Sequence, residues 1–238
     1  INEIAAHYTP IHNDKKKIMR GDLVKLDVGV HLDGHIADTA VTIEVGTTNY
    51  TQLINASRAA LAMAISTVKN GNELSQVGSA ISKIITMYHY RPIVNLSGHL
   101  LLPYTLHAGK SVPNVGTKEN GRMEKGEVYA IEPFATNGNG YVENWKNSNI
   151  YKIEHLSPLN DDEGLNEFLR RIFEEFNYLP FAERWCAKID PKFEFYLQRL
   201  KNKRVIRCYP ILIEKSRGFV AQFEHTVMVM DNGGEQIT

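Results

Sequence analysis

Residues 21–43 read GDLVKLDVGVHLDGHIADTAVTI, and this stretch decides the fold. Two strand-like runs flank Asp33-Gly34, a dipeptide that strongly indicates a two-residue hairpin turn. Val, Ile, Leu and Thr dominate both runs, as is typical of strands that pack against a core. The stretch therefore predicts an antiparallel hairpin that turns at Asp33-Gly34.

Each arm of this hairpin carries one acid in apolar surroundings, Asp27 before the turn and Asp38 after it. If Asp33 and Gly34 are the turn residues, Asp27 lies opposite Ala40, and Asp38 is its diagonal neighbour on the same face. Two like charges in a dry core need protons or cations between them, and a metal ion is the simplest remedy. The alternative is a pair of turn-flanking acids at a solvated sheet edge.

The composition excludes several classes of partner. The chain has 238 residues, 43% of them hydrophobic, which is enough for one large domain or one domain with an insert. Its 27 Lys and Arg equal its 27 Asp and Glu, so net charge favours neither nucleic acid nor a membrane surface. No apolar run approaches the roughly 18 residues of a transmembrane helix, and no signal peptide is visible.

Three further expectations follow from the chain as a whole. The two cysteines, Cys186 and Cys208, suit a reducing cytoplasm and exclude a disulfide framework. The chain begins at Ile1 without Met, so we expect a fragment whose N-terminal segment is missing. No contiguous exposed apolar stripe stands out, so we expect a monomer.

Two helices are predicted after the hairpin. Residues 49–70 have an apolar face at helical spacing and are followed by Gly71 as a stop. Residues 74–90 have a second such face and end before Arg91-Pro92. Two helices of this kind are suited to cover one face of a sheet, so the predicted fold class is α+β.

Histidines in one irregular segment suggest a site. His99 and His107 lie in residues 92–114, where glycines and prolines argue against a continuous element. A lone histidine is usually a satisfied polar group, but two in an apolar, glycine-bounded segment favour a site. We expect the remaining histidines apart from His7 to be surface or packing residues, namely His12, His31, His35, His89, His155 and His225.

A weak internal repeat adds another acid. Residues 125–134 (KGEVYAIEPF) resemble the opening of the first hairpin arm, because Glu132 follows Gly126 by six residues as Asp27 follows Gly21. Two similar half-domains would present carboxylates to a shared centre in this way.

The last candidate interrupts an apolar strand predicted over residues 219–230. Glu224 and His225 are adjacent there and must point to opposite faces of a strand. One of them faces the site, and we choose Glu224.

Together the candidates are four carboxylates and one imidazole: Asp27, Asp38, His99, Glu132 and Glu224. A structural zinc site would favour Cys and His. Four carboxylates carry too much negative charge for one divalent ion but suit two bridged ions. Oxygen-rich ligation with one histidine indicates Co, Mn, Fe or Zn without choosing among them.

The chain changes character after residue 141, where charged residues are dense and candidate ligands are few. Helices are predicted near 162–177 and 192–203. We interpret residues 149–204 as a small helical insert, and residues 1–148 and 205–238 as the catalytic domain.

Six stretches spread over the whole chain carry a resemblance to a known family: NEIAAHYTP, KLDVGVHLDGHIADTAVT, NLSGHLLLPYTLHAGKSVPN, MEKGEVYAIEPFATNGNG, YLPFAERW and VAQFEHTV. In order and spacing the chain resembles methionine aminopeptidases of type 2, in their short archaeal form. The resemblance implies the pita-bread fold, a curved antiparallel sheet covered by helices, with a winged-helix-like insert. An insert between the last two carboxylate ligands distinguishes type 2, and residues 132 and 224 are 92 apart here.

The resemblance also implies roles for the metal ligands. Asp27 would chelate one ion with both oxygens, and Asp38 and Glu224 would bridge two ions. His99 would bind the other ion, with Glu132 beside it. A hydroxide between the ions would attack the first peptide bond, and Glu132 would shuttle its proton to the leaving amine.

By the same resemblance, other residues hold the substrate, the N-termini of nascent polypeptides. His107 would stabilise the tetrahedral oxyanion, and His7 would hold the substrate backbone on the leaving side. Tyr209 and Leu106 would help form the methionine pocket, although ordinary core packing explains Tyr209 nearly as well. Transient association with the ribosome is a further implied partner.

Two other interpretations stay open. A related pita-bread peptidase, Xaa-Pro aminopeptidase or prolidase, shares the ligand set, but the stretch NLSGHLLLPYTLHAGK and the insert favour the methionine enzyme. A non-catalytic pita-bread protein would bind partners such as the ribosome or RNA. Such relatives typically lose metal ligands and gain basic tails, whereas this chain keeps every ligand and has no net charge.

Overall fold

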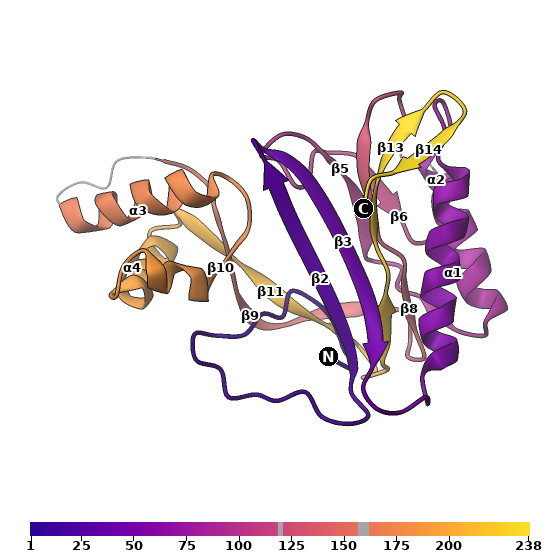
Figure 1. The fold of residues 1–238 in the computed structure, drawn as a ribbon, viewed down its shortest axis with the longest axis horizontal. Helices are drawn as coiled ribbons and strands as arrows, with labels where there is room; N and C mark the ends of the chain where they lie inside the picture. Colours follow the sequence, from indigo (N-terminus) through magenta and orange to yellow (C-terminus); the bar gives the residue numbers. More distant parts are fainter. Residues whose placement is uncertain (119–120, 157–161) are drawn as a thin grey trace. The chain divides into compact units, whose positions relative to one another are not determined.

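A computed structural model describes residues 1–118, 121–156 and 162–238 (Figure 1). The chain forms two compact units. The first unit contains residues 1–5, 18–143 and 213–238, and the second contains residues 6–17 and 144–212. The second unit therefore includes a short N-terminal segment that the sequence had assigned to the catalytic domain. The division into a catalytic domain and an insert stays a prediction.

The predicted hairpin is confirmed in the first unit as β2 (Leu23–Leu32) and β3 (His35–Glu44), which follow β1 (Ile4–Ala6), a strand whose last residue belongs to the second unit. Asp27 pairs with Ala40, as predicted, and Asp38 pairs with Gly29 on the same face. Asp33 and Gly34 have φ values of 50° and 86°. Positive φ at both central residues is the signature of the tight turn that matches strand twist, and it fixes this register.

The outer face of this hairpin is apolar and exposed, with Leu26, Val28, Val30, Leu32, Val41 and Ile43 all open to solvent. These residues alternate along β2 and β3 with those of the inner face. The expectation that no apolar stripe is exposed is therefore wrong. The sequence did not reveal this stripe, because a strand that is buried on both faces and a strand whose apolar outer face is exposed can have the same composition. The expectation of a monomer loses its support.

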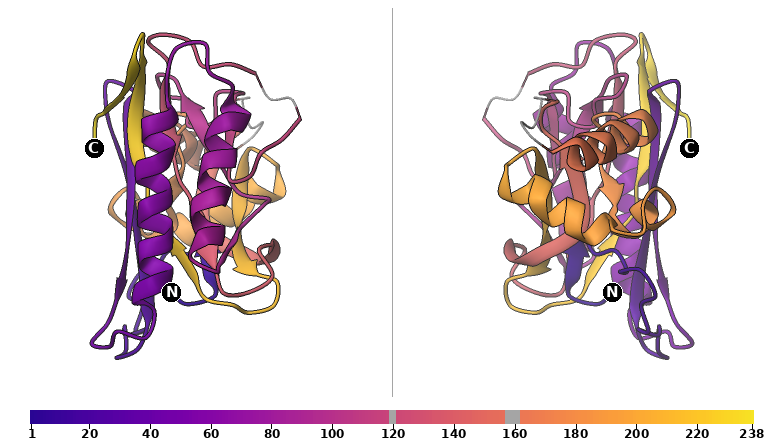
Figure 2. Two further views of the ribbon diagram at one scale, coloured as in Figure 1. Left: turned by 90° about the vertical axis from the view of Figure 1, so that its right-hand side faces the viewer. Right: turned by 90° about the vertical axis from the view of Figure 1, so that its left-hand side faces the viewer.

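Two helices, α1 (Thr51–Thr67) and α2 (Leu74–Met87), lie side by side in the first unit (Figure 2). Both were predicted, with ends within three residues. A capping box starts α2, where Glu73 and Gln76 exchange side chain-to-backbone hydrogen bonds. The apolar faces of α1 and α2 pack in the main core together with strand residues such as Tyr129, Ile131 and Val227. The α+β class is thereby confirmed. Among the described residues, no helix has the length and apolar character needed to span a membrane.

The strands of the first unit form two further sheets. The larger runs in the order β14-β13-β7-β5-β6, with β5 (Ser97–Leu101), β6 (Ser111–Pro113), β7 (Val128–Ile131), β13 (His225–Met230) and β14 (Gly233–Gln236). The smaller runs in the order β12-β8-β4, with β4 (Arg91–Pro92), β8 (Phe134–Thr136) and β12 (Val220–Gln222). Neighbours in both are antiparallel wherever their pairing is described.

One predicted strand differs from the structure. Residues 219–230 form not one strand but two, β12 and β13, which belong to different sheets. The chain leaves the ladder at Phe223-Glu224, where Glu224 instead pairs with Ala40 of β3. In addition, the segment expected to be irregular contains strand β5, which carries His99.

The second unit combines helices with a sheet. The predicted helices are confirmed as α3 (Glu163–Phe176) and α4 (Phe193–Asn202), with a 3₁₀ helix η1 (Glu183–Lys188) between them. Its strands β9 (Val142–Ile153), β10 (Phe181–Ala182) and β11 (Ile206–Glu214) take the order β11-β9-β10. The insert is thus helical only in part. Its apolar core is separate from that of the first unit, and both cysteines are free thiols.

A buried carboxylate holds two loops of the first unit together. Glu214 is fully buried and accepts hydrogen bonds from the backbone N–H groups of Asn139, Gly140, Ser216 and Gly218, and from the Ser216 hydroxyl. Burial alone would raise its pKa, but these donors stabilise the ionised form and the pKa is lowered.

We expect Glu214→Gln to destabilise the protein by about 3 kcal/mol at pH 7, because the new amide group faces N–H donors that then lose an acceptor. A depressed pKa stabilises the fold above the ordinary value of 4.5, and this contribution is lost as pH falls through the folded-state pKa. Urea unfolding at pH 7 and at pH 4 should show the difference from wild type narrowing at low pH. Glu235→Gln, at an exposed position, should change neither value.

Candidate metal centre

Glu132 and Glu224 lie where one pair of strands is interrupted. Strand β8 follows β7 along the chain, and β13 follows β12. β7 pairs with β13 and β8 pairs with β12, but the residues between them, 132–133 and 223–224, do not pair with each other. Freed from the regular alternation of a strand, both glutamates direct their carboxylates toward the Gln222 amide. The interruption therefore explains how two acids enter a core of apolar strands.

The hairpin is joined to this interruption through Glu224. The backbone N–H of Glu224 donates to the Ala40 carbonyl at 3.0 Å, and the Ala40 N–H donates back at 3.3 Å. The hydroxyl of Thr39 also donates to the Glu224 carbonyl at 2.8 Å. These bonds fix the main chain of one acid directly against the strand that carries Asp38.

Two more threonines continue this connection on either side. The hydroxyl of Thr226 accepts from the Asp38 N–H at 2.7 Å and donates to the Asp38 carbonyl at 2.8 Å. Thr42 makes the same pair of bonds to the main chain of Gln222, at 2.8 and 2.7 Å. A hydroxyl can accept and donate at once, so each threonine satisfies two backbone groups.

Three of the predicted ligands form a buried group. One ligand atom from each of Asp38, His99 and Glu224 lies within 4.8 Å of the others, and all three residues are buried. Asp27 and Glu132 approach the same place, because the amide nitrogen of Gln222 lies 3.0 Å from Asp27 Oδ2 and 3.3 Å from Glu132 Oε2. The structure thus brings all five candidates together, and their oxygen-rich donor set fits divalent cations.

Burial and mutual repulsion disfavour the ionised carboxylates. Burial, and then the Asp27 carboxylate, raise the pKa of Asp38 to about 7. Burial also raises the pKa values of Glu132 and Glu224 well above the ordinary range, and the next cause is repulsion by Asp27 for Glu132 and by Glu132 for Glu224. Burial also raises the pKa of Asp27, although part of this residue reaches solvent, and Gln222 partly opposes that shift. Cations among these groups would remove the cost of ionising them.

The two histidines of the irregular segment are in contact. The ring centroids of His99 and His107 are 4.4 Å apart, with the rings inclined by 52°. Burial, and then His107, lower the pKa of His99 to about 3. His99 is therefore neutral at pH 7, and a neutral imidazole offers a lone pair to a cation. Its Nε2 lies 3.6 Å from Glu132 Oε1, beyond hydrogen-bond distance.

His7 and Tyr209 lie together in the second unit. Their rings meet edge to face with centroids 5.2 Å apart, and His7 Nδ1 lies 2.9 Å from the Pro210 carbonyl oxygen. Burial lowers the pKa of His7, so its ring is neutral at pH 7. Because a carbonyl oxygen only accepts, Nδ1 carries the hydrogen and Nε2 is left as an acceptor. Leu106, the other pocket candidate, belongs to the first unit and is half-buried.

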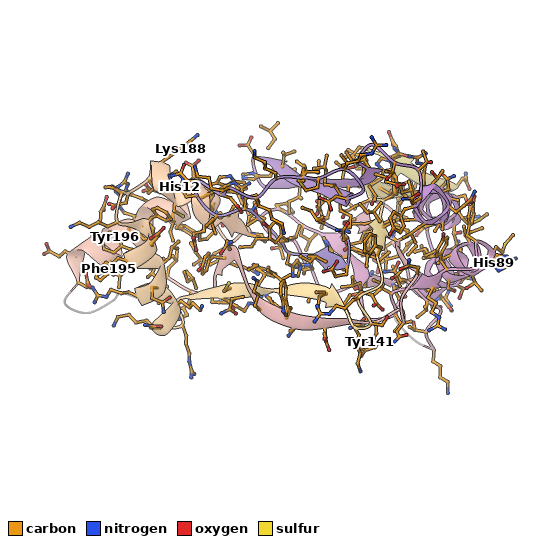
Figure 3. The ribbon with its side chains drawn as sticks, turned by 90° about the horizontal axis from the view of Figure 1, so that it is seen from below. His12, His89, Tyr141, Lys188, Phe195 and Tyr196 are labelled. Carbon is orange, nitrogen blue, oxygen red and sulfur yellow. The ribbon has the colours of Figure 1, made fainter. Side chains whose placement is uncertain are left out.

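The histidines assigned to the surface lie outside this cluster. His89 projects from the surface beyond α2, and His12 lies at the surface of the second unit, edge to face with Phe193 (Figure 3). His225 contacts the Thr238 hydroxyl through Nδ1 at 3.2 Å, and the buried ligand group contains Glu224 but not His225. The choice of Glu224 over its neighbour therefore agrees with where the two side chains lie.

Gln222 is the residue at the cluster that sequence reasoning missed. It contacts three of the carboxylates, although it is uncharged and ends the otherwise apolar strand β12. The available signal was its spacing, since it precedes Glu224 by two residues and positions i and i+2 share one face of a strand.

Comparison with known proteins identifies the family. The model of metallopeptidase family M24 matches residues 1–231. The chain belongs to this family. It is 44% identical to the methionine aminopeptidase of Saccharolobus solfataricus over 232 residues, which are 96% of this chain and 77% of that protein. Identity to the methionine aminopeptidase of Archaeoglobus fulgidus is also 44%, over 100% of this chain and 79% of that protein. M24 enzymes are metallopeptidases, so the chain is a hydrolase that uses divalent metal.

Solved structures show the M24 fold directly. A thermophilic Arx1 has a TM-score of 0.81 at 18% identity, over 97% of this chain and 71% of that one. The methionine aminopeptidase of Thermotoga maritima has a TM-score of 0.67 at 23% identity, over 99% of this chain and 70% of that one. The prolidase of Pyrococcus furiosus has a TM-score of 0.54 at 18% identity, over 94% of this chain and 43% of that one. The predicted pita-bread fold is thereby confirmed.

We expect the metal-stripped protein to lose stability as pH rises from 5 to 7. A carboxyl group whose folded-state pKa is raised keeps its proton in the native state, so stability falls from the unfolded-state pKa up to the folded-state value, about 7 for Asp38. The loss is at most about 3 kcal/mol per retained proton over this range.

Urea unfolding in the presence of a chelator measures this slope. Mn²⁺ in excess of the chelator should remove this dependence of stability on pH. Asp38→Asn should make the dependence less steep, because one titrating group is gone. A midpoint that does not change between pH 5 and 7 in the chelated wild type would contradict the expectation.

Proposed function

We propose that this chain is a methionine aminopeptidase of type 2, which removes the initiator methionine from nascent polypeptides. The observation that carries the proposal is the gathering of four carboxylates and one neutral imidazole in a chain 44% identical to curated methionine aminopeptidases. The substrate would be the free N-terminus of a new protein. Contact with the ribosome, where such termini emerge, and a cytoplasmic location stay predictions that follow from this substrate.

We assign two divalent cations to Asp27, Asp38, His99, Glu132 and Glu224. Four carboxylates neutralise two such ions but overcompensate one, which supports a dinuclear site. Co, Mn, Fe and Zn all suit oxygen-rich ligation with one imidazole. When bound, the cations supply an activated water at neutral pH and stabilise negative charge on the scissile carbonyl oxygen.

The chain's own residues would complete the reaction. Glu132 can take the proton of the attacking water and return it to the leaving amine, because burial favours its protonated form. His107, which contacts His99, is suited to donate a hydrogen bond to the developing oxyanion. His7 presents Nε2 as an acceptor, which suits an N–H of the substrate backbone.

The defining experiment measures release of free methionine. Metal-stripped protein, resupplied with Mn, Fe, Co or Zn, should cleave a Met-Gly peptide and leave Xaa-Pro peptides intact. Asp38→Asn should lower this activity by about 100-fold or more, because loss of an outer-shell partner alone costs 10–100-fold. Asp231→Asn makes the same change at an exposed acid paired with Lys125, and it should cleave normally.

Preference for Xaa-Pro peptides would instead identify a prolidase-like or Xaa-Pro aminopeptidase activity. No cleavage of either substrate with any of the four metals would favour a non-catalytic protein on the same fold.

The role assigned to His7 has its own test. We expect His7→Ala to lower kcat/KM by about 100-fold, the usual cost of losing one positioned hydrogen-bonding group in a hydrolase site. Bound metal should not change, because His7 is not among the assigned ligands. His12→Ala removes an exposed histidine of the same unit and should keep full activity. Equal activities of His7→Ala and wild type would remove His7 from the site.

A further inference from the structure

The residue that connects the acids of the cluster is Gln222. It is the last residue of β12 and is almost completely buried. Its main chain is fixed from two sides, by pairing with Phe134 of β8 and by the two hydrogen bonds to the Thr42 hydroxyl. The side chain therefore starts from a rigid position and has little freedom to leave the cluster.

The Gln222 amide nitrogen faces three carboxylates. Its Nε2 lies 3.0 Å from Asp27 Oδ2, 3.3 Å from Glu132 Oε2 and 3.3 Å from Glu224 Oε2. The oxygen of the amide would repel the same groups, so electrostatics fixes which end points inward. An NH₂ group has two hydrogens, so it can serve two of the three acceptors at once and bridges the set.

We propose that Gln222 is a positioning residue for the cations, an inference that rests on the proposed function. Its two hydrogens hold oxygens of two of the three acids at a time, so that the remaining lone pairs of these carboxylates point toward the bound ions. Glu224 belongs to the buried group with Asp38 and His99, whereas Asp27 and Glu132 do not. Gln222 thus connects the two subsets of ligands.

A neutral donor suits this place better than any charged side chain. A lysine would bring its own positive charge and compete with the cations for the same oxygens. A glutamate would add a fifth acid to groups that already repel one another. The amide supplies hydrogens without changing the net charge that the cations must balance, and an apolar residue would leave the buried oxygens without a donor.

The test measures metal affinity directly. Gln222→Met keeps the length of the side chain and removes the donor, and we expect it to bind Mn²⁺ 10–100-fold more weakly by isothermal titration calorimetry. Asn114→Leu is the matched control, because Asn114 is an equally buried amide that bonds Leu96 and Phe134 and none of the carboxylates. It should lose stability without losing affinity for Mn²⁺. Wild-type affinity in Gln222→Met would overturn the proposal.

Gln222→Glu separates the donor from the charge and has nearly the same shape, so it covers the case in which the methionine variant does not fold. If Gln222 acts as a donor, Gln222→Glu binds Mn²⁺ more weakly despite its added negative charge, and tighter binding would overturn the proposal. Wild-type protein that binds Mn²⁺ but releases no methionine would contradict the proposed function and leave the role of Gln222 intact. Wild-type protein that binds no divalent ion would contradict both.

Discussion

Electrostatic repulsion among four carboxylates is the constraint on which the first unit depends. Ionised acids so close together in a buried site destabilise the fold unless protons or cations intervene, and the pKa of Asp38, raised to about 7, records that conflict. A protein does not keep such an arrangement for stability, because apolar residues of similar size would pack at lower cost. The cluster is therefore retained for function, and the packing of the surrounding strands offsets its unfavourable contribution to stability.

The chain meets this constraint through its backbone. Glu132 and Glu224 leave their strands at the same point, so neither acid has to fit the alternation of a regular sheet. Asp27 and Asp38 keep regular pairing and reach the centre by their register alone. One pair of ligands thus depends on a break in a ladder, and the other pair depends on an unbroken one.

This difference decides what the sequence could predict. The register of Asp27 and Asp38 follows from Asp33-Gly34, because a two-residue turn leaves one way to pair the arms. The break at Phe223-Glu224 has no such local signal, since the segment 219–230 is mostly apolar on both sides of its polar residues and is predicted as one strand. The exposed outer face of the hairpin was missed because composition does not distinguish an apolar face that is open to solvent from one that is buried. Gln222 was missed because a neutral side chain gives no charge anomaly, and its role depends on which atoms surround it in space.

The threonine connections make this centre sensitive to single substitutions in a way that a regular ladder is not. Where Thr42 and Thr226 replace direct N–H···O=C pairing, the hydroxyl of a side chain holds the main chain of Gln222 or Asp38. A substitution leaves the backbone groups of a regular rung in place, whereas Thr→Val at either position would keep the shape but remove the acceptor of a buried N–H and a donor to a C=O. The join between the hairpin and residues 222–226 therefore rests on the identity of two side chains.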